Sequence, residues 1–410
     1  DPVNAWDGNF KNIVRSANHV NYLRSMGEVA LASLSETVRP AMVHGLAPYM
    51  KTIGHLATNL KGVKMAVAEA KSAGNIVDGV LGHRLATLAD INDPYASRGP
   101  IEAFLENMTS FVSKWNGIGM LTDMQKSIAS VMSQDRILKT ASVYGDAKPA
   151  DKRFLAYVGI DQSMAERIAA QFKTHGDDVN GVKVANTEKW SDDVARRTYR
   201  AAMNKDIDSI ITTKGVADTP LFANTPTGRA LLQFKSFALA SHQRVLLRGL
   251  QEDKTRFLGG LIAMSTIGMM ATWLKAQSGN RDERLQKFSQ NPGWWISEGI
   301  DRSGVLSVPM ELANMFEKAT GLNPLKAPMK AFDEGQAQSQ KNQNRNAIGS
   351  LLGPTFGTAQ DALTVAAVPK KVVSGEEITK GDKNAAERLL PFNSYLGVRQ
   401  ILKYAINPPN

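Results

Sequence analysis

The feature that most constrains this chain is an uncharged run of eighteen residues, FLGGLIAMSTIGMMATWL, from Phe257 to Leu274. Arg256 and Lys275 bracket the run, and the chain as a whole is polar, with a mean hydropathy of -0.24. A helix of this length reaches roughly 27 Å, slightly less than the ~30 Å hydrocarbon core of a bilayer. The run is therefore predicted to be either a short membrane-spanning helix or a helix buried in a protein core.

Several details of the run favour insertion into a membrane. Trp273 stands at its far end, where interfacial aromatic side chains are common. Two pairs of small residues spaced four apart would allow close helix contact, namely Gly259/Ala263 and Gly268/Thr272. The marginal length and the polar Ser265 and Thr266 fit equally well a helix that stays buried until a trigger exposes it. The side chains predicted to contact a membrane are Phe257, Leu258, Leu261, Ile262, Met264, Ile267, Met269, Met270, Trp273 and Leu274.

A basic amphipathic helix is predicted directly before this run. Thr225 followed by Pro226 is a good helix start, because threonine caps free backbone donors and proline is tolerated in the first turn. We expect this helix and the apolar run to form a long helical hairpin. The side chains predicted to contact DNA or an anionic surface are Arg229, Lys235, Arg244, Arg248, Lys254 and Arg256. The alternatives are a partner-binding helix or an ordinary bundle helix with solvated charges.

Composition limits the partners and the chemistry. The chain has 410 residues, a formal net charge of +10 and no cysteine. The positive charge favours an anionic partner, whether nucleic acid, acidic phospholipid or acidic protein. Without cysteine there are no disulfides, thiolate metal sites or thiol nucleophiles. The fold must therefore rest on packing alone.

Hydrophobic periodicity predicts a mainly α fold, an extended multi-helix assembly with short loops and little or no sheet. The segment from Gly181 to Ala185 alternates like a strand, but it is short enough to be a local ribbon at most. Composition shifts suggest an N-terminal helical region (1–150), a middle helical region (151–220), the basic helix with the apolar hairpin (221–321), a polar linker (322–346) and a C-terminal docking tail (347–410). The tail forms an extended C-terminal arm that is too small to fold alone and is expected to dock on the body or on a neighbouring subunit.

The sequence carries no recognisable catalytic or metal-binding motif. Its six histidines are scattered, no HExxH pair occurs, and neither a phosphate-binding glycine loop nor a GxSxG elbow is present. We therefore expect no enzymatic activity, no catalytic residue, no metal and no cofactor. The arginines Arg196, Arg197 and Arg200 of a predicted helix either hold phosphate or solvate that helix, and the second reading is the commoner one.

Five segments occur in an order that resembles the C-terminal region of the large internal virion proteins, or DNA ejection proteins, of short-tailed phages. They are Ser25–Leu46, Thr225–Leu250 (TPTGRALLQFKSFALASHQRVLLRGL), the apolar run that follows, Leu351–Leu363 (LLGPTFGTAQDAL) and Leu389–Leu402 (LLPFNSYLGVRQIL). The resemblance covers most of the chain.

This resemblance implies storage in the capsid interior and ejection ahead of the genome. It also implies homo-oligomerisation, assembly with other ejection proteins into a conduit through the host periplasm and inner membrane, and non-specific contact with phage double-stranded DNA and with anionic lipid. Some family members carry a peptidoglycan transglycosylase, but its glutamate motif has no match here. The alternatives are a part of a virion-packaged enzyme, such as that transglycosylase or a virion RNA polymerase, whose catalytic module lies elsewhere, and a DNA-binding capsid scaffold.

Overall fold

Helices dominate the part of the chain that the computed structural model describes. This part comprises residues 17–24, 33–73, 118–211, 246, 249–250, 253–278, 288, 290–320, 322–325, 327–330, 353–390 and 394–395. Within it, sheet is restricted to one two-stranded ribbon. The predicted mainly α fold is therefore confirmed. The helices before the ribbon are η2 (Leu34–Val38), α3 (Arg39–His44), α4 (Leu46–Thr58), α5 (Leu60–Ser72), α8 (Ile118–Ser142), η3 (Tyr144–Asp146), α9 (Pro149–Val158) and α10 (Gln162–His175).

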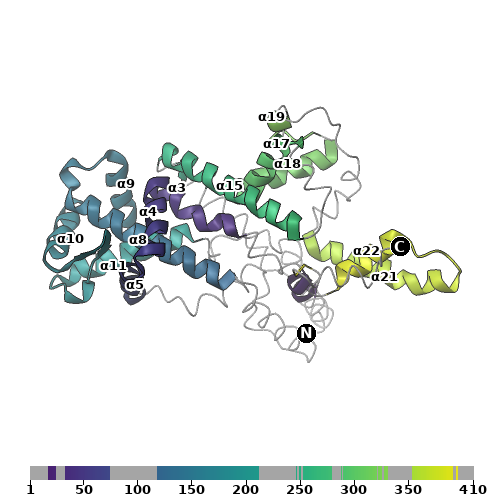
Figure 1. Cartoon of the computed structure of the whole chain (residues 1–410), viewed down its shortest axis with the longest axis horizontal. Helices are drawn as coiled ribbons and strands as arrows, with labels where there is room; N and C mark the ends of the chain where they lie inside the picture. The colour runs from purple at the N-terminus through teal and green to yellow at the C-terminus, as the bar shows by residue number, and fades with distance from the viewer. Residues whose placement is uncertain are drawn as a thin grey trace, which may run out of the picture.

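The ribbon and the remaining helices complete the order of elements. They are β1 (Asp177–Val179), β2 (Val182–Val184), η4 (Thr187–Lys189), α11 (Asp193–Ile210), α15 (Lys254–Ser278), α17 (Pro292–Ser303), α18 (Ser307–Thr320), α19 (Ala327–Lys330), α21 (Gly353–Val373) and α22 (Lys380–Leu389). The described elements form an elongated arrangement, with α9, α10 and α11 at one end and α21 and α22 at the other (Figure 1).

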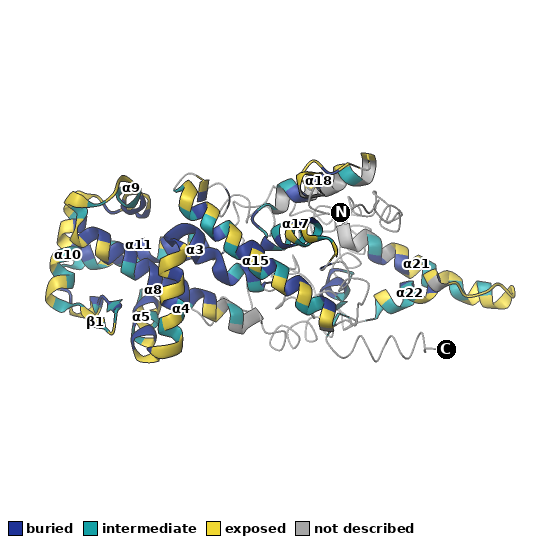
Figure 2. Ribbon diagram, turned by 45° about the horizontal axis from the view of Figure 1, so that its top comes forward, coloured by how far each residue is buried: buried dark blue, intermediate teal, exposed yellow. Residues whose placement is uncertain are grey.

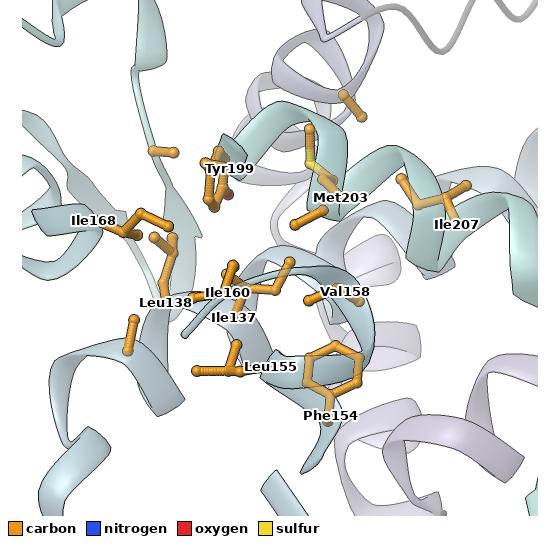
Figure 3. Close-up of a cluster of buried hydrophobic side chains, with 14 of the residues drawn as sticks. Ile137, Leu138, Phe154, Leu155, Val158, Ile160, Ile168, Tyr199, Met203 and Ile207 are labelled. Atoms are coloured by element: carbon orange, nitrogen blue, oxygen red, sulfur yellow. The ribbon is translucent and has the colours of Figure 1, made fainter. Parts of the chain in front are cut away.

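One hydrophobic core lies among α8, α9, α10 and α11 (Figure 3). Its fully buried members include Phe154, Leu155, Ile168 and Tyr199. Aspartates cap two of these helices: Asp161 accepts a hydrogen bond from the backbone of α10, and Asp192 does the same for α11. A capped amphipathic helix exposes one face and buries the other, so these four helices close around a common interior.

The ribbon confirms the local strand pairing expected around Gly181. Asp177 pairs with Val184 and Val179 with Val182 in antiparallel register. The two residues between the strands, Asn180 and Gly181, both have positive φ, of 50° and 86°. An Asn-Gly pair suits such a hairpin turn, because both residue types tolerate the left-handed region.

Two helix boundaries differ from the expected ones. The spacing of apolar residues predicts separate helices over Thr122–Met132 and 135–144, but α8 is continuous from Ile118 to Ser142. The polar residue at the expected break, Gln134, is fully buried and donates a hydrogen bond to the carbonyl of Ala66 at 2.6 Å. This bond holds the Gln134 side chain against α5, and α8 continues through the expected break.

The second difference concerns the segment from about His55 to Ala73, where apolar spacing predicts one helical run but the structure has a break. Asn59 separates α4 from α5, accepts a hydrogen bond from the amide of Gly62 and donates one to the carbonyl of Val179. Asparagine at this position caps the second helix and ties it to the ribbon. The run therefore becomes two helices divided at Asn59.

The C-terminal arm is a pair of helices. Arg388 of α22 forms hydrogen bonds with both carboxylate oxygens of Asp361 in α21, and Lys371 pairs with Asp382 at 2.9 Å. Thr358 hydrogen-bonds Asn21, so the arm docks on the segment 17–24. The Gly353-Pro354 pair predicts a break within the weakly apolar segment 347–367, but it is in fact the start of α21, since proline is tolerated in the first helical turn.

Two further expectations concern the chain around the arm. Of the expected polar linker 322–346, the structure describes 322–325 and a helical turn at Ala327–Lys330. The sequence also predicts a short helix after Pro391, and this segment lies almost wholly outside the described residues.

The arm should loosen in acid through Asp382. Hydrogen bonds from Lys371 and from Thr379 lower the pKa of this carboxyl to about 2. Because its pKa in the unfolded chain is about 3.9, the stabilisation is present above pH 4 and is lost as the pH falls towards 2. We expect Asp382→Asn to be cut within α22 by pepsin faster than wild type at pH 4, and equally fast at pH 2. An equal difference at both pH values would contradict this assignment.

Candidate membrane-contact helix

Helix α15 contains the uncharged run. Within the described residues, one segment is long and apolar enough to cross a membrane by length and composition, namely Lys254–Gln277, 24 residues with a mean hydropathy of 1.6. About a third of its apolar window, 33%, is buried inside the protein. A core helix of a soluble protein passes the same test, so the packing of each face decides what α15 can do.

The helix begins at a capping aspartate. Asp253 accepts hydrogen bonds from the backbone amides of Thr255 at 2.9 Å and Arg256 at 3.1 Å. Partial burial raises the pKa of Asp253, but these two backbone hydrogen bonds and the charge of Arg256 more than offset that effect and lower it overall. The carboxylate is therefore charged at neutral pH and stabilises the helix N-terminus.

Arg256, predicted to contact an anionic surface, is engaged within the protein. Its guanidinium lies 3.1 Å from Asp151 of α9 and 3.5 Å from Asp253. Arg136 of α8 shares the same Asp151 carboxylate at 3.2 Å, and its guanidinium stacks over the ring of Phe154. This network ties the first turn of α15 to the α8–α11 core.

The inner face of α15 belongs to a second hydrophobic core. Phe257 and Met264 are 6% and 0% exposed and pack in one cluster with Met42 of α3, Ile128 of α8 and Val305, which follows α17. Helix α15 contacts α17, α3, η2 and α4. Figure 2 shows α3 buried almost throughout beside it. This face is thus an ordinary protein interior.

Glycines let the inner face approach two neighbouring backbones. A Cβ on Gly260 would lie 2.6 Å from the Cα of Met42, and one on Gly268 would lie 2.5 Å from the carbonyl oxygen of Gly299 in α17. A Cβ on Gly299 would in turn lie 2.6 Å from the carbonyl oxygen of Ser265. Separations below 3 Å exclude any side chain, so α15 and α17 cross at a glycine-to-glycine contact.

Polar groups reinforce that crossing. The indole nitrogen of Trp295 in α17 donates a hydrogen bond to the carbonyl of Met269 at 3.1 Å. Thr272 is buried and donates to the carbonyl of Gly268 at 2.8 Å. Since both donors are satisfied by helix carbonyls, the contact contains polar side chains at little desolvation cost.

The outer face of α15 is apolar and exposed. Leu258, Ile262, Met270 and Trp273 are 56%, 60%, 46% and 41% exposed. Their spacing of four, eight and three residues places them on one side of the helix. Thr266, the polar residue in the middle of this stripe, donates its hydroxyl to the carbonyl of Ile262 at 2.9 Å. We call these four apolar residues and Thr266 the outer stripe.

The predicted membrane-contacting residues therefore fall into three groups. Phe257 and Met264 are buried, whereas Leu258, Ile262, Met270 and Trp273 are exposed. The half-buried ones are Leu261, Ile267, Met269 and Leu274.

Of the side chains predicted to contact DNA or an anionic surface, Lys254 and Arg256 lie among the described residues. Lys254 is exposed in the first turn of α15. Arg229, Lys235, Arg244 and Arg248 lie outside the described residues. Of the first arm of the expected hairpin, the structure describes Leu246, Gly249 and Leu250, and Leu246 packs in one cluster with Phe257 of α15. The helices that contact α15 most extensively are α3 and α17.

The close helix contacts of Gly260 and Gly299 were not predicted from the sequence. Of the two small-residue pairs, Gly268/Thr272 lies in the α17 contact, whereas a Cβ on Gly259 would meet nothing within 4 Å. The adjacent glycines at 259 and 260 are the only sequence feature that indicates a close contact with Met42, and they do not show which glycine faces the neighbouring helix.

Other candidate sites are accounted for by internal contacts. Among the described residues there is no group of three or more acidic or histidine side chains that could hold a metal. Arg196 and Arg197 pair with Asp193, and Arg200 pairs with Glu188. His44 lies 3.0 Å from Asp206 in the interior. In the part of the chain that is described, these side chains are therefore held by contacts within the protein.

The described residues form a mainly helical protein. Its apolar helix α15 has one face in a hydrophobic core and one apolar face on the surface. No protein-family model, no curated protein and no solved structure matches the chain.

Proposed function

We propose that this chain is a structural, non-enzymatic segment of an internal virion protein of a short-tailed phage. It is carried in the capsid, leaves ahead of the genome, and assembles with copies of itself and with other ejection proteins into a conduit across the host envelope. Helix α15 is the element that contacts the inner membrane. The observation that carries this proposal is the outer stripe, an exposed apolar face on a helix whose other face is packed.

Three properties support the proposal. Helices rely on local contacts and re-form quickly, which suits a protein that must pass a narrow portal. The absence of cysteine leaves no covalent cross-link to hinder that passage. A net charge of +10 attracts DNA phosphates without reading sequence, so a genome can move past without being held at one place.

The membrane contact is tested by flotation with vesicles that contain phosphatidylglycerol. We expect wild type to float and Ile262→Asp to partition about tenfold or more weakly, because a charge in the apolar stripe must be desolvated. Leu60→Asp is the matched control: Leu60 of α5 is 56% exposed, close to the 60% of Ile262, but lies away from α15. The control should float like wild type.

Two results would contradict the membrane role. One is a wild-type chain that stays unbound to anionic vesicles. The other is an equal loss in both variants, which would mean that any added negative charge weakens binding and that the outer stripe has no special part in it.

A further inference from the structure

We infer that α15 contacts the bilayer lengthwise, with its outer stripe lying in the interfacial zone of a single leaflet, while its inner face stays packed on α3 and α17. This inference rests on the proposed membrane role and specifies its geometry. It differs from a spanning helix, in which all sides of α15 would meet lipid or other spanning helices.

The shape of the outer stripe fits a membrane surface. From Leu258 to Trp273 it runs for about 22 Å along the helix. Along this length the exposed side chains are apolar except for Thr266, whose hydroxyl is already bonded to its own helix. A helix that is apolar on one side and packed on the other buries that side in the region between headgroups and acyl chains.

The ends of the stripe carry the groups expected at a lipid interface. Lys254 is exposed at the start of the helix, and Lys275 follows Trp273 and Leu274 at its end. Lysine next to anionic headgroups and tryptophan at the boundary are both favourable. With uncharged residues between them, a flat anionic surface is the partner that this pattern of charge complements.

The inner face argues against spanning. Full insertion would break the glycine contacts with Met42 and Gly299 and expose Met264, which is 0% exposed. It would also free the indole of Trp295 from the carbonyl of Met269. Contact through the outer stripe requires none of these changes, because the four apolar side chains already face outward.

The test uses the absence of native cysteine. Single cysteines introduced at 258, 262, 270 and 273 are spin-labelled, and their depth in phosphatidylglycerol-containing vesicles is measured by power saturation with oxygen and a nickel complex. Lengthwise contact predicts similar, shallow depths for all four labels, within roughly 5–10 Å of the headgroup boundary. A label at Leu60→Cys should remain in water.

A second measurement follows the inner face. Met264→Cys should stay unreactive towards N-ethylmaleimide with and without vesicles, whereas Ile262→Cys should react fast in solution and at least tenfold more slowly when vesicles are bound. If Met264→Cys does not fold, Ala271→Cys, which is 1% exposed, takes its place as the buried probe.

The outcomes separate the two proposals. Labels that are deep near 262 and 270 and shallow at 258 and 273 would overturn lengthwise contact in favour of spanning. Labels that stay out of lipid but broaden one another would show that a second copy covers the stripe, and this also overturns it. Failure of the proposed membrane role itself is seen separately, as a chain that does not float with vesicles at all.

Discussion

Gly268→Val is expected to destabilise the α15–α17 unit by about 3 kcal/mol, because its Cβ would lie 2.5 Å from the carbonyl oxygen of Gly299. Backbone atoms cannot rotate out of the way like the end of a flexible side chain, so the two helices must separate. Separation would also break the hydrogen bond from Trp295 to Met269. The effect is measured as a shift of the urea transition, followed by tryptophan fluorescence.

Gly259→Ala is the control for this prediction. A Cβ on Gly259 meets nothing within 4 Å, and alanine is about 1 kcal/mol more favourable than glycine inside a helix. We therefore expect the same or slightly higher stability. Equal losses of stability in both variants would show that the close contact between Gly268 and Gly299 does not hold α15 against α17.

Asp206→Ala is expected to lower the free energy of unfolding by about 2–3 kcal/mol. The carboxylate of Asp206 in α11 lies 3.0 Å from Nε2 of His44 in α3, and the two side chains are 0% and 1% exposed. Removing one partner leaves a buried imidazole nitrogen without its carboxylate, which costs far more than losing a surface pair. Because this contact joins α3 to the α8–α11 core, urea denaturation should report a loss across both cores.

The matched control for this change is Asp208→Ala, two residues further along the same helix. Asp208 is exposed, so its removal should change the free energy of unfolding by less than about 1 kcal/mol. A variant that keeps the side-chain carbonyl, Asp206→Asn, should lose less than Asp206→Ala. Equal losses for Asp206→Ala and Asp208→Ala would contradict the role of the buried pair.

Much of the helical structure could be predicted from the sequence, because capping and periodicity are local properties. Asp161 caps α10 and Gly176 follows its last residue, and both residue types predict such helix ends. The expected ribbon at Gly181 also forms, since Asn-Gly suits a tight hairpin. The helix boundaries that were predicted wrongly depend on contacts with residues distant in the sequence. Gln134 continues α8 by bonding Ala66, and Asn59 divides a run by bonding Val179.

The sequence predicts the position of the candidate membrane-contact helix, but it does not predict which side of that helix is buried and which is exposed. Composition alone identified the run from Phe257 to Leu274, and spacing suggested close helix contacts. Which glycine meets a neighbour depends on the direction from which α3 and α17 approach, and the local sequence does not encode that direction. Arg256 is a similar case, because its ion pair with Asp151 depends on α9 lying beside the first turn of α15.

Residue type and periodicity alone predict a helical, basic protein without cysteine, in which one uncharged segment is long enough to require an apolar environment. The division of that segment into a buried and an exposed face comes from its neighbours in the fold. Packing places Phe257 and Met264 in a core and leaves Leu258, Ile262, Met270 and Trp273 outside, because the neighbouring helices cover only one side of α15.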